Sequence, residues 1–205
     1  MTQTHPVKTV AHEALLQASR RIDWRFLLPT PDLGRVACIC VTDADLLESL
    51  ALFSASLDVA DSTSAAGLDA PYDLVVLRNP RREVIEAVPG LLRPGGWLYV
   101  EVETSIPSRH ADAPRSARGC ARTLRRMGLV EVDTHVHWPD FASCRAIIPL
   151  DDVAAVRHGL ARGRTSGARV VTRLAPLLAG TRQLALFVPC ASAIGRQPEE
   201  AGEGR

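Results

Sequence analysis

The chain has 205 residues, and an apolar fraction of 46% is enough to build a buried core, which excludes a wholly disordered protein. Its 24 lysines and arginines against 23 aspartates and glutamates leave a formal charge of +1, which argues against a dedicated nucleic-acid binder. No apolar run approaches the roughly 20 residues of a membrane helix, so we expect no membrane partner. Five scattered cysteines without a Cys-x-x-Cys pair, and first residues that show no secretion signal, favour free thiols and a cytoplasmic location.

The first half of the sequence alternates between apolar strands and helices. A helix is predicted over residues 7–22, and the prolines at 29 and 31 prevent it from continuing. After it we predict a buried strand over 36–41, a helix over 42–55, a strand over 57–61, a loop over 62–71, a buried strand over 72–77, a helix over 81–92, a tight turn over 93–96 and a strand over 97–102. Thr42 and Asp45 have the spacing of a capping box at a helix start. Apolar strands that alternate with helices indicate a parallel sheet with crossover helices, the α/β class.

The second half is less regular. We predict an exposed basic loop over 104–116, a helix over 117–127 ended by Gly128, a strand over 130–137 that alternates and so should be half-exposed, helices over 151–163 and 168–179, and a last strand over 183–194. The expected organisation is a lead-in over residues 1–33, an α/β domain over 34–195 and a disordered tail over 196–205.

Two segments resemble the middle of class I S-adenosylmethionine (SAM)-dependent methyltransferases. Tyr72-Asp-Leu-Val-Val-Leu77 is similar to the family's fourth strand, and Leu91-Leu-Arg-Pro-Gly-Gly-Trp-Leu-Tyr-Val100 is similar to the turn into its fifth. Gly95 and Gly96 permit positive φ in this turn. The order of the later elements is similar too, so the resemblance covers residues 34–195.

The resemblance implies a single doubly wound, mostly parallel sheet with flanking helices, the Rossmann-like methyltransferase fold. Between Asp61 and Tyr72 there are only ten residues, too few for the helix and third strand that the family inserts at this point. We therefore expect a sheet shortened by about one βα unit.

The resemblance also implies SAM as the cofactor. In this family a glycine-rich loop ends the first strand, where the backbone approaches the cofactor, but here the segment over 38–44 contains no glycine. The helix start at Thr42 and Asp43 could still meet a carboxylate, and Asp61, at the end of the second strand, is the candidate for holding ribose hydroxyls. Arg78, which follows the fourth strand, is a further cofactor-binding candidate. The alternative for Asp61 is a helix cap or a solvated loop acid.

Histidines give the candidate for acid–base chemistry. Asp133, His135 and His137 leave one face of their predicted strand, and His137 is the candidate catalytic base because the pKa of imidazole lies near neutral pH. We expect no metal, because no third strong ligand is visible. The alternative is the polar face of an edge strand. Trp138 and Phe141 are candidates for lining a substrate pocket, or else close the edge of the core.

Two acids finish the predicted strand over 97–102. Glu101 and Glu103 lie on one face of it, and Glu101 is the candidate substrate-binding acid; solvated acids at a strand end are the common alternative. Asn79-Pro80 matches part of a motif of amino-group methyltransferases, but the aromatic residue of that motif is missing, so a turn before a helix is the simpler interpretation.

Two functions follow from these features. The first is a SAM-dependent methyltransferase that acts on a small molecule or a biosynthetic peptide, a reaction that needs little beyond positioning. The second is a catalytically inactive pseudo-methyltransferase that serves as a binding or scaffold subunit of a biosynthetic enzyme complex, and the missing glycines favour it. The partners are then a substrate or a partner enzyme, with a homodimer as a further expectation. A nicotinamide-dependent reductase ranks below both, because it needs the same glycines and Lys8 is the sole lysine.

Overall fold

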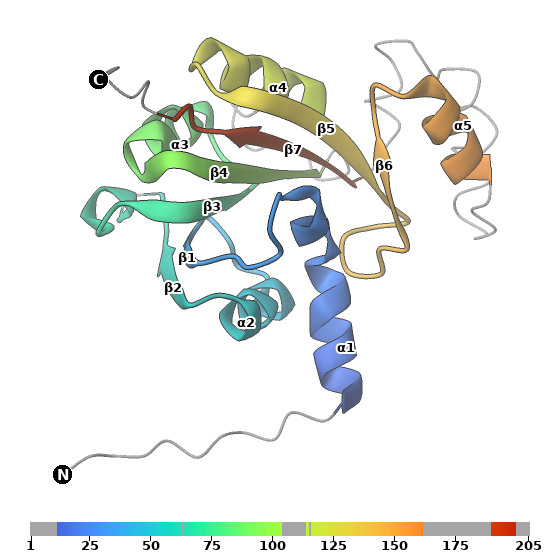
Figure 1. Cartoon of the computed structure of the whole chain (residues 1–205), viewed down its shortest axis with the longest axis horizontal. Coiled ribbons are helices and arrows are strands. Elements are labelled where there is room, and N and C mark those ends of the chain that lie inside the picture. Colours follow the sequence, from blue (N-terminus) through green and yellow to red (C-terminus); the bar gives the residue numbers. More distant parts are fainter. Residues whose placement is uncertain (1–11, 63, 104–113, 115, 162–189, 200–205) are drawn as a thin grey trace, which may run out of the picture.

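Seven strands form a single mixed sheet in the computed structural model of this chain (Figure 1). The structure describes residues 12–62, 64–103, 114, 116–161 and 190–199. The helix predicted over 168–179 lies outside the described residues, as do most of the predicted basic loop and the beginnings of the first helix and the last strand.

The strands are β1 (Arg35–Ile39), β2 (Ser56–Ala60), β3 (Tyr72–Arg78), β4 (Leu92–Glu103), β5 (Val130–Trp138), β6 (Ala146–Pro149) and β7 (Cys190–Arg196). The α-helices are α1 (His12–Arg21), α2 (Ala44–Phe53), α3 (Arg82–Ala87), α4 (Ala117–Arg126) and α5 (Val153–Ala161). Short 3₁₀ helices are η1 (Asp23–Leu27), η2 (Ala65–Gly67) and η3 (Val88–Gly90). None of the helices in the described ranges is long and apolar enough to cross a membrane.

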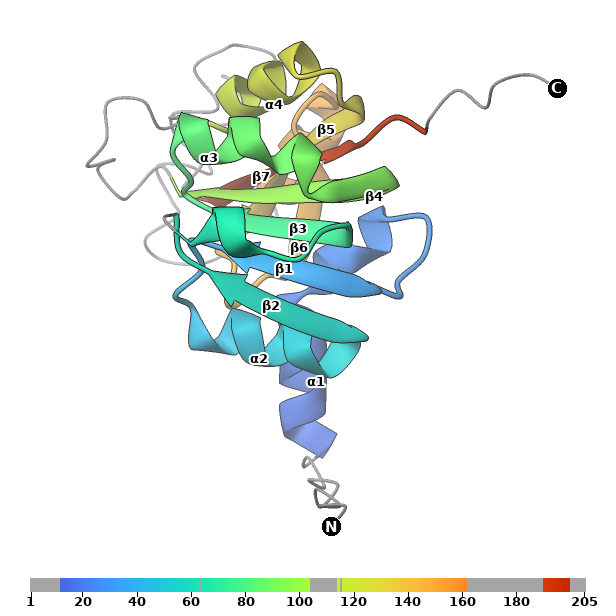
Figure 2. The ribbon, with the colours of Figure 1, turned by 90° about the vertical axis from the view of Figure 1, so that its left-hand side faces the viewer.

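The strand order is β2-β1-β3-β4-β7-β5-β6, and Figure 2 shows β4, β3, β1 and β2 one below another. The first four strands are mutually parallel, with Val36 of β1 opposite Leu74 of β3. The last strand, β7, is antiparallel to both of its neighbours, β4 and β5. Between β2 and β3 the described residues contain one short 3₁₀ helix and no strand, so the predicted loss of one βα unit is confirmed.

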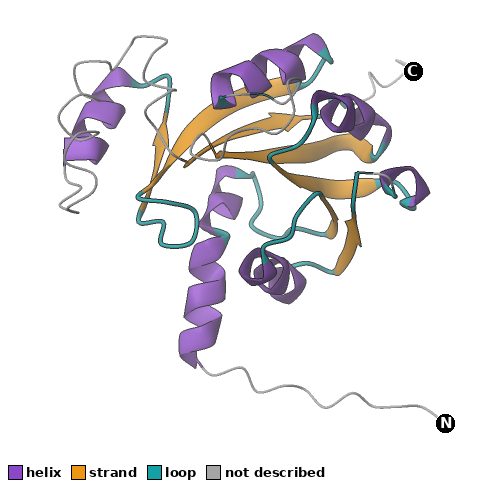
Figure 3. Cartoon of the chain, turned by 180° about the vertical axis from the view of Figure 1, so that it is seen from behind, coloured by secondary structure: helices purple, strands orange, loops and turns teal. Residues whose placement is uncertain are grey.

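Apolar side chains cover both faces of the sheet, which explains why β1 and β3 read as continuous apolar runs. On one face, Leu46 and Leu50 of α2 pack with Trp24 of η1 against the central strands. On the other face, Ile85 of α3 and Leu124 of α4 pack against them. Helices on both faces confirm the doubly wound α/β fold, and Figure 3 shows the strands at the centre with α1 projecting from the body.

The glycine turn before β4 belongs to the strand itself, because β4 begins at Leu92. Gly95 has the predicted positive φ, +75°. Gly96 does not, so that part of the prediction is wrong. A Cβ added to Gly96 would lie 2.9 Å from the carbonyl oxygen of Arg93 and 3.0 Å from that of Tyr72, so close approach of the backbone is what requires glycine there.

The start of α2 differs from the predicted capping box by one residue. Asp43 is the N-cap, and its Oδ1 accepts a hydrogen bond from the backbone N–H of Leu46 at 3.2 Å. Thr42 therefore lies before the helix cap and is exposed. A carboxylate at this position satisfies an otherwise free amide and also favours the positive end of the helix dipole. For α4 the predicted end is confirmed, since Gly128 follows it with φ +87°.

The strand predicted over 130–137 is present as β5, and Glu131 and Asp133 on its predicted polar face are exposed, but the half-exposed character does not extend to its second half and the alternative of an edge strand is wrong. Strand β5 lies inside the sheet, between β7 and β6, and the side chains of both His135 and His137 are buried. The outer strand β6 contains Ile147 and Ile148, a short apolar segment after the β5–β6 turn that was not predicted as a strand. Its pairing covers the edge that β5 would otherwise expose.

Candidate functional site

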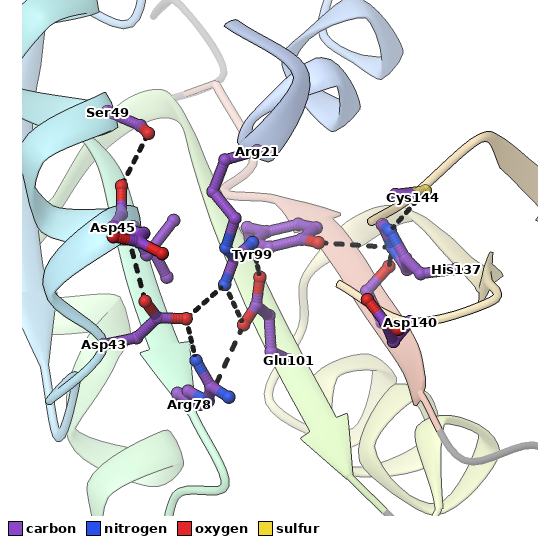
Figure 4. Close-up of polar contacts among 12 residues, drawn as sticks. Arg21, Asp43, Asp45, Ser49, Arg78, Tyr99, Glu101, His137, Asp140 and Cys144 are labelled. Carbon is purple, nitrogen blue, oxygen red and sulfur yellow. Dashed lines mark hydrogen bonds and ion pairs between the residues drawn. The ribbon is translucent and has the colours of Figure 1, made fainter. Parts of the chain in front are cut away.

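Five charged residues meet at the carboxyl ends of β1, β3 and β4, the edge where open α/β sheets bind ligands. Parallel pairing sets Arg78 of β3 opposite Glu101 of β4, and the period of two along β4 brings Glu103 to the same face. Asp43 follows β1, and Arg21 comes from the last turn of α1 (Figure 4). We call Arg21, Asp43, Arg78, Glu101 and Glu103 the strand-end ion network.

The centre of this network is a buried bidentate pair. One terminal nitrogen of Arg21 lies 2.8 Å from Glu101 Oε1, and the other lies 3.0 Å from Oε2. The second nitrogen also donates to Asp43 Oδ2 at 3.1 Å. The Arg21 side chain is 4% exposed and that of Glu101 is 0% exposed, so the bonds form in a site from which water is largely excluded.

Arg78 ties the remaining acids together. Its guanidinium donates hydrogen bonds to Asp43 Oδ2 and to Glu103 Oε1, and its Nε lies 3.9 Å from Glu101 Oε2. The side-chain oxygen of Asn79 accepts from the backbone N–H of Glu103 at 2.8 Å. Every charged member of the network therefore has a partner of opposite charge within the chain.

The pKa shifts follow from burial and pairing. Burial raises the pKa of the Glu101 carboxyl, and the cations of Arg21 and Arg78 oppose that rise. Burial also disfavours the Arg21 cation, but its bonds to Glu101 outweigh this effect and raise its pKa. For Asp43, the bonds from Arg21 and from a backbone N–H outweigh burial and lower the pKa. Arg21 and Asp43 are therefore held in their charged forms at neutral pH.

A cavity of about 440 Å³ opens beside the network and is lined by Cys40, Thr42, Asp43, Arg78 and Asn79. The structure thus brings together three of the residues proposed for cofactor binding. Cys40 has φ +62° and Asn79 has φ +44°, so both strand ends turn through the left-handed region that favours glycine. The chain adopts the sharp turn of a glycine-containing loop with side chains present.

The fourth cofactor candidate lies elsewhere. Asp61 follows β2 and is exposed, and its Oδ1 accepts hydrogen bonds from Ser64 N at 2.7 Å and from Ser64 Oγ at 2.8 Å. These are bonds within one loop, as the alternative interpretation of a loop acid expects. Asp61 is not among the residues that line the cavity of the network.

His137 lies in a buried cluster with Tyr99, Ser192 and Phe141. Its Nε2 lies 2.8 Å from Ser192 Oγ and 3.2 Å from the hydroxyl of Tyr99, and its Nδ1 lies 3.7 Å from Cys144 Sγ. The side chain is 2% exposed, and burial lowers the pKa of the imidazole to about 3. Both ring nitrogens have partners and the ring is neutral at pH 7, so this placement favours a structural role. Catalysis by His137 stays a prediction.

The two aromatic residues proposed for a substrate pocket are buried. Trp138 packs with Val136 and Ile148 at the β5–β6 end of the sheet. The ring of Phe141 lies with its centre 4.7 Å from that of His137. These positions match the alternative in which the two aromatics close the core. Substrate binding by Glu101, Trp138 and Phe141 stays a prediction. The alternative interpretation of Glu101 as a solvated acid at a strand end is wrong, because its side chain is buried.

Arg21 and Trp24 were not predicted as functional or anchoring residues from the sequence. A basic residue in the last turn of a helix reads as a partner of the helix dipole, and nothing near Arg21 in the sequence marks it as a buried ion-pair partner. The ring of Trp24 stacks on Tyr99 with centres 3.8 Å apart and planes at 9°, which anchors the segment after α1 on the sheet. A tryptophan between a helix and two prolines was the available signal for such an anchor.

The residues at the strand ends do not fit SAM. The helix start that could have met the donor's carboxylate is capped by Asp43. The acids that could have met its cationic groups already hold Arg21 and Arg78. Thr42 and Ala44 add side chains where the family's backbone approaches its cofactor. Among the described residues, no group of three or more His, Cys, Asp and Glu side chains could hold a metal ion.

The strand order, with β7 antiparallel between β4 and β5, is that of a class I methyltransferase-like fold. The fold is shortened, because one βα unit is missing beside β2. Neither a protein-family model nor a curated protein matches the sequence.

Two solved structures that are similar to this chain are described as methyltransferases. A Haemonchus contortus phosphoethanolamine N-methyltransferase 2, bound to phosphomonomethylethanolamine and S-adenosylhomocysteine, is 11% identical with a TM-score of 0.48 over 88% of this chain and 53% of its own. The chain thus spans about half the length of that protein. A Thermotoga maritima SAM-dependent methyltransferase, described as a possible histamine N-methyltransferase, is 12% identical with a TM-score of 0.48 over 89% of both chains. Their substrates and cofactors are properties of those proteins.

Proposed function

We propose that this protein is a catalytically inactive pseudo-methyltransferase that serves as a binding or scaffold subunit of a biosynthetic enzyme complex. The observation that carries the proposal is the strand-end ion network. Its buried Arg21–Glu101 pair fills the edge of the sheet that the resemblance assigns to the methyl donor.

Charge explains why the network opposes a methyl donor. SAM carries a sulfonium cation, an ammonium group and a carboxylate, and each would need a partner of opposite charge. To offer Glu101 to a cation, the chain would have to withdraw Arg21 and leave a buried guanidinium with fewer partners, which is costly. The same holds for Asp43, which binds two arginines and caps α2.

Methyl transfer to a small molecule or a biosynthetic peptide is the second candidate function. Two observations favour it: the cavity of about 440 Å³ beside the network, and the left-handed turn at Cys40, which keeps the backbone course of a glycine loop. In that case Thr42 and Asp61 would contact the donor, and Arg78 would exchange Asp43 for the donor's carboxylate.

Calorimetric titration of the whole protein with SAM and with S-adenosylhomocysteine separates the two candidates. We expect no heat of binding and no thermal shift up to millimolar ligand. Occupancy at 100 times the dissociation constant would stabilise the fold by about 2.7 kcal/mol, which a thermal scan detects. A clear shift that is lost in Asp61→Ala and kept in Asp69→Ala, a matched exposed acid, would establish the donor site and reject the proposal.

A test in the producing cell addresses the scaffold role. Thr42 is exposed and lines the cavity, so Thr42→Trp fills the space while the core stays intact. For a scaffold, deletion of the gene should stop product formation and Thr42→Trp should leave it unchanged. Product loss with Thr42→Trp at normal protein abundance would favour the second candidate, and Arg126→Trp, at an exposed position of α4, is the control for a bulky surface residue.

A further inference from the structure

The outer edge of β2 has no neighbouring strand. Strand β2 lies at one end of the strand order, and Figure 2 shows it at the margin of the sheet. The carbonyl oxygen of Ala60 accepts from the backbone N–H of Cys40 at 3.1 Å, so the backbone groups of Ala60 point toward β1. Because this direction alternates along a strand, the backbone groups of Leu57 and Val59 point outward. No strand in the described ranges pairs with them.

Helix α2 packs over this margin and turns an uncharged face outward. Its core face is buried, and a second face, with Asp45 and Glu48, lines a groove against α1. The remaining face holds Ala44, Leu47 and Ala51, which are three and four residues apart. Since α1 is bonded to β4 at the centre of the sheet, this face points away from the centre, past β2. Ala44 and Ala51 are exposed and Leu47 is half-buried.

The strand edge and the helix face form one apolar surface. Leu57 and Val59 leave the same face of β2, the face that packs with α2, and Val59 is 54% exposed. The charged residue of β2, Asp58, points to the other face, where it accepts a hydrogen bond from the Tyr72 hydroxyl at 2.8 Å. We call this surface, which contains no charged side chain, the β2 edge surface. Its members are Ala44, Leu47, Ala51, Leu57 and Val59.

The charge of this surface decides which partner suits it. In a two-fold pair each surface meets a copy of itself, so a patch of one charge would face its own charge. The uncharged β2 edge surface avoids that repulsion, and the small side chains of Ala44 and Ala51 allow two helices to approach closely. The opposite margin of the sheet differs, because β6 contains Pro149, which lacks the N–H that edge pairing needs, whereas β2 contains no proline.

We propose that two copies of this chain form a homodimer through the β2 edge surface. The two β2 strands pair antiparallel about a two-fold axis perpendicular to the sheet, with Val59 opposite Val59 of the second copy. Each Val59 donates its N–H to the carbonyl oxygen of the other, and the two sheets become one continuous sheet. The axis keeps both α2 helices on one face, where their outward faces meet. Asp58 lies opposite Ala60 in this register, whereas a register centred on Asp58 would set two carboxylates opposite each other.

Sedimentation velocity over a range of concentrations measures the mass of the whole protein in solution. We expect a species of twice 22.1 kDa that dissociates on dilution. Val59→Lys sets two like charges opposite each other and should weaken the dimer at least about tenfold. Ala51→Glu sets carboxylates between the two α2 helices and should act in the same direction. A wild type that stays monomeric at every concentration overturns the proposal, and a strand of another protein is then the remaining occupant of this edge.

Two matched variants control for the added charges. Val130→Lys changes a second exposed valine, 39% exposed at the start of β5, and Ala154→Glu changes an exposed alanine of α5. Both should leave the dimer unchanged. Circular dichroism checks that each variant is folded, which we expect because Val59 and Ala51 are exposed. A dimer that is as stable in Val59→Lys and Ala51→Glu as in the wild type lies on another surface and contradicts the proposal.

An engineered disulfide tests the register. Residues directly opposite each other in a hydrogen-bonded antiparallel pair have Cα atoms about 5.5 Å apart, within the range that a disulfide spans. Val59→Cys should therefore give a covalent dimer after mild oxidation, seen on a non-reducing gel and reversed by a thiol. The wild type, whose described cysteines are free, and Val130→Cys should give none. Covalent dimers formed equally fast by Val130→Cys and Val59→Cys would reflect random collision and overturn the proposed pairing.

Discussion

The buried pair of Arg21 and Glu101 gives a sharp test of what holds α1 on the sheet. Replacing Arg21 by Met keeps an unbranched, flexible side chain and removes the guanidinium with its charge. Glu101 then stays 0% exposed without its two bonds at 2.8 and 3.0 Å, and its nearest remaining cation is the Nε of Arg78 at 3.9 Å. Loss of one partner from a buried ion pair costs about 3–5 kcal/mol.

The matched variants identify the source of that loss. Glu101→Gln leaves Arg21 with Asp43 as a partner, so we expect a smaller loss of about 1–3 kcal/mol. The double variant Arg21→Met/Glu101→Gln removes both buried charges and should recover part of the stability lost in Arg21→Met. Arg20→Met, one residue away and exposed, should stay within about 0.5 kcal/mol of the wild type.

Urea unfolding followed by circular dichroism measures these free energies, provided that the slope with denaturant is the same for all variants. Thermal scans should agree, with a fall of about 6–20 °C in Tm for Arg21→Met. A loss below about 1 kcal/mol in Arg21→Met would refute a buried coupled pair. Strictly additive losses would refute it too, that is, a double variant whose loss of stability equals the sum of the losses in Arg21→Met and Glu101→Gln.

Three other variants test features of the fold by urea unfolding. The pKa of His137 is lowered from 6.5 to about 3, so its contribution to stability is present above pH 6.5 and is lost as the pH falls toward 3. Between pH 7 and pH 5 the free energy of unfolding of the wild type should therefore fall by about 2 kcal/mol more than that of His137→Gln. Identical pH profiles of the two proteins would contradict this. His158→Gln, at an exposed position, is the control and should follow the wild type. Gly96→Ala should cost about 1–3 kcal/mol because its Cβ meets backbone oxygens, while Gly90→Ala has open space and should be nearly neutral, so equal effects would argue against close approach. Ser116→Ala removes the N-cap of α4 and should cost about 1 kcal/mol, and a failure of Ser116→Asp to restore it would argue against capping.

Much of the fold could be predicted because its signals are local. Apolar runs over 36–41 and 72–77 identify central strands, and the ten residues after Asp61 are too few for another βα unit. The interior position of β5 could not be found in this way. The alternation of apolar and polar residues along 130–137 is the same for an edge strand and for a strand whose neighbour comes from a distant segment of the chain. Here β5 pairs with both β6 and β7.

The candidate site was predicted in part for the same reason. Carboxyl ends of parallel strands meet at one edge, so Thr42, Asp43 and Arg78 could be placed together from the sequence, and they do line one cavity. The partner of Glu101 is 80 residues away in the chain, on α1. No local pattern encodes that contact, because the packing of α1 and η1 against the sheet decides it.

The position of β7 has a consequence for synthesis of the protein. The segment that completes the centre of the sheet, between β4 and β5, follows the other strands in the sequence. During translation, β4 and the β5–β6 hairpin therefore leave the ribosome with one edge each unpaired, and these edges stay open until residues 190–196 emerge. Unpaired strand edges attract other chains, so a nascent chain that pauses before this segment should need chaperones most.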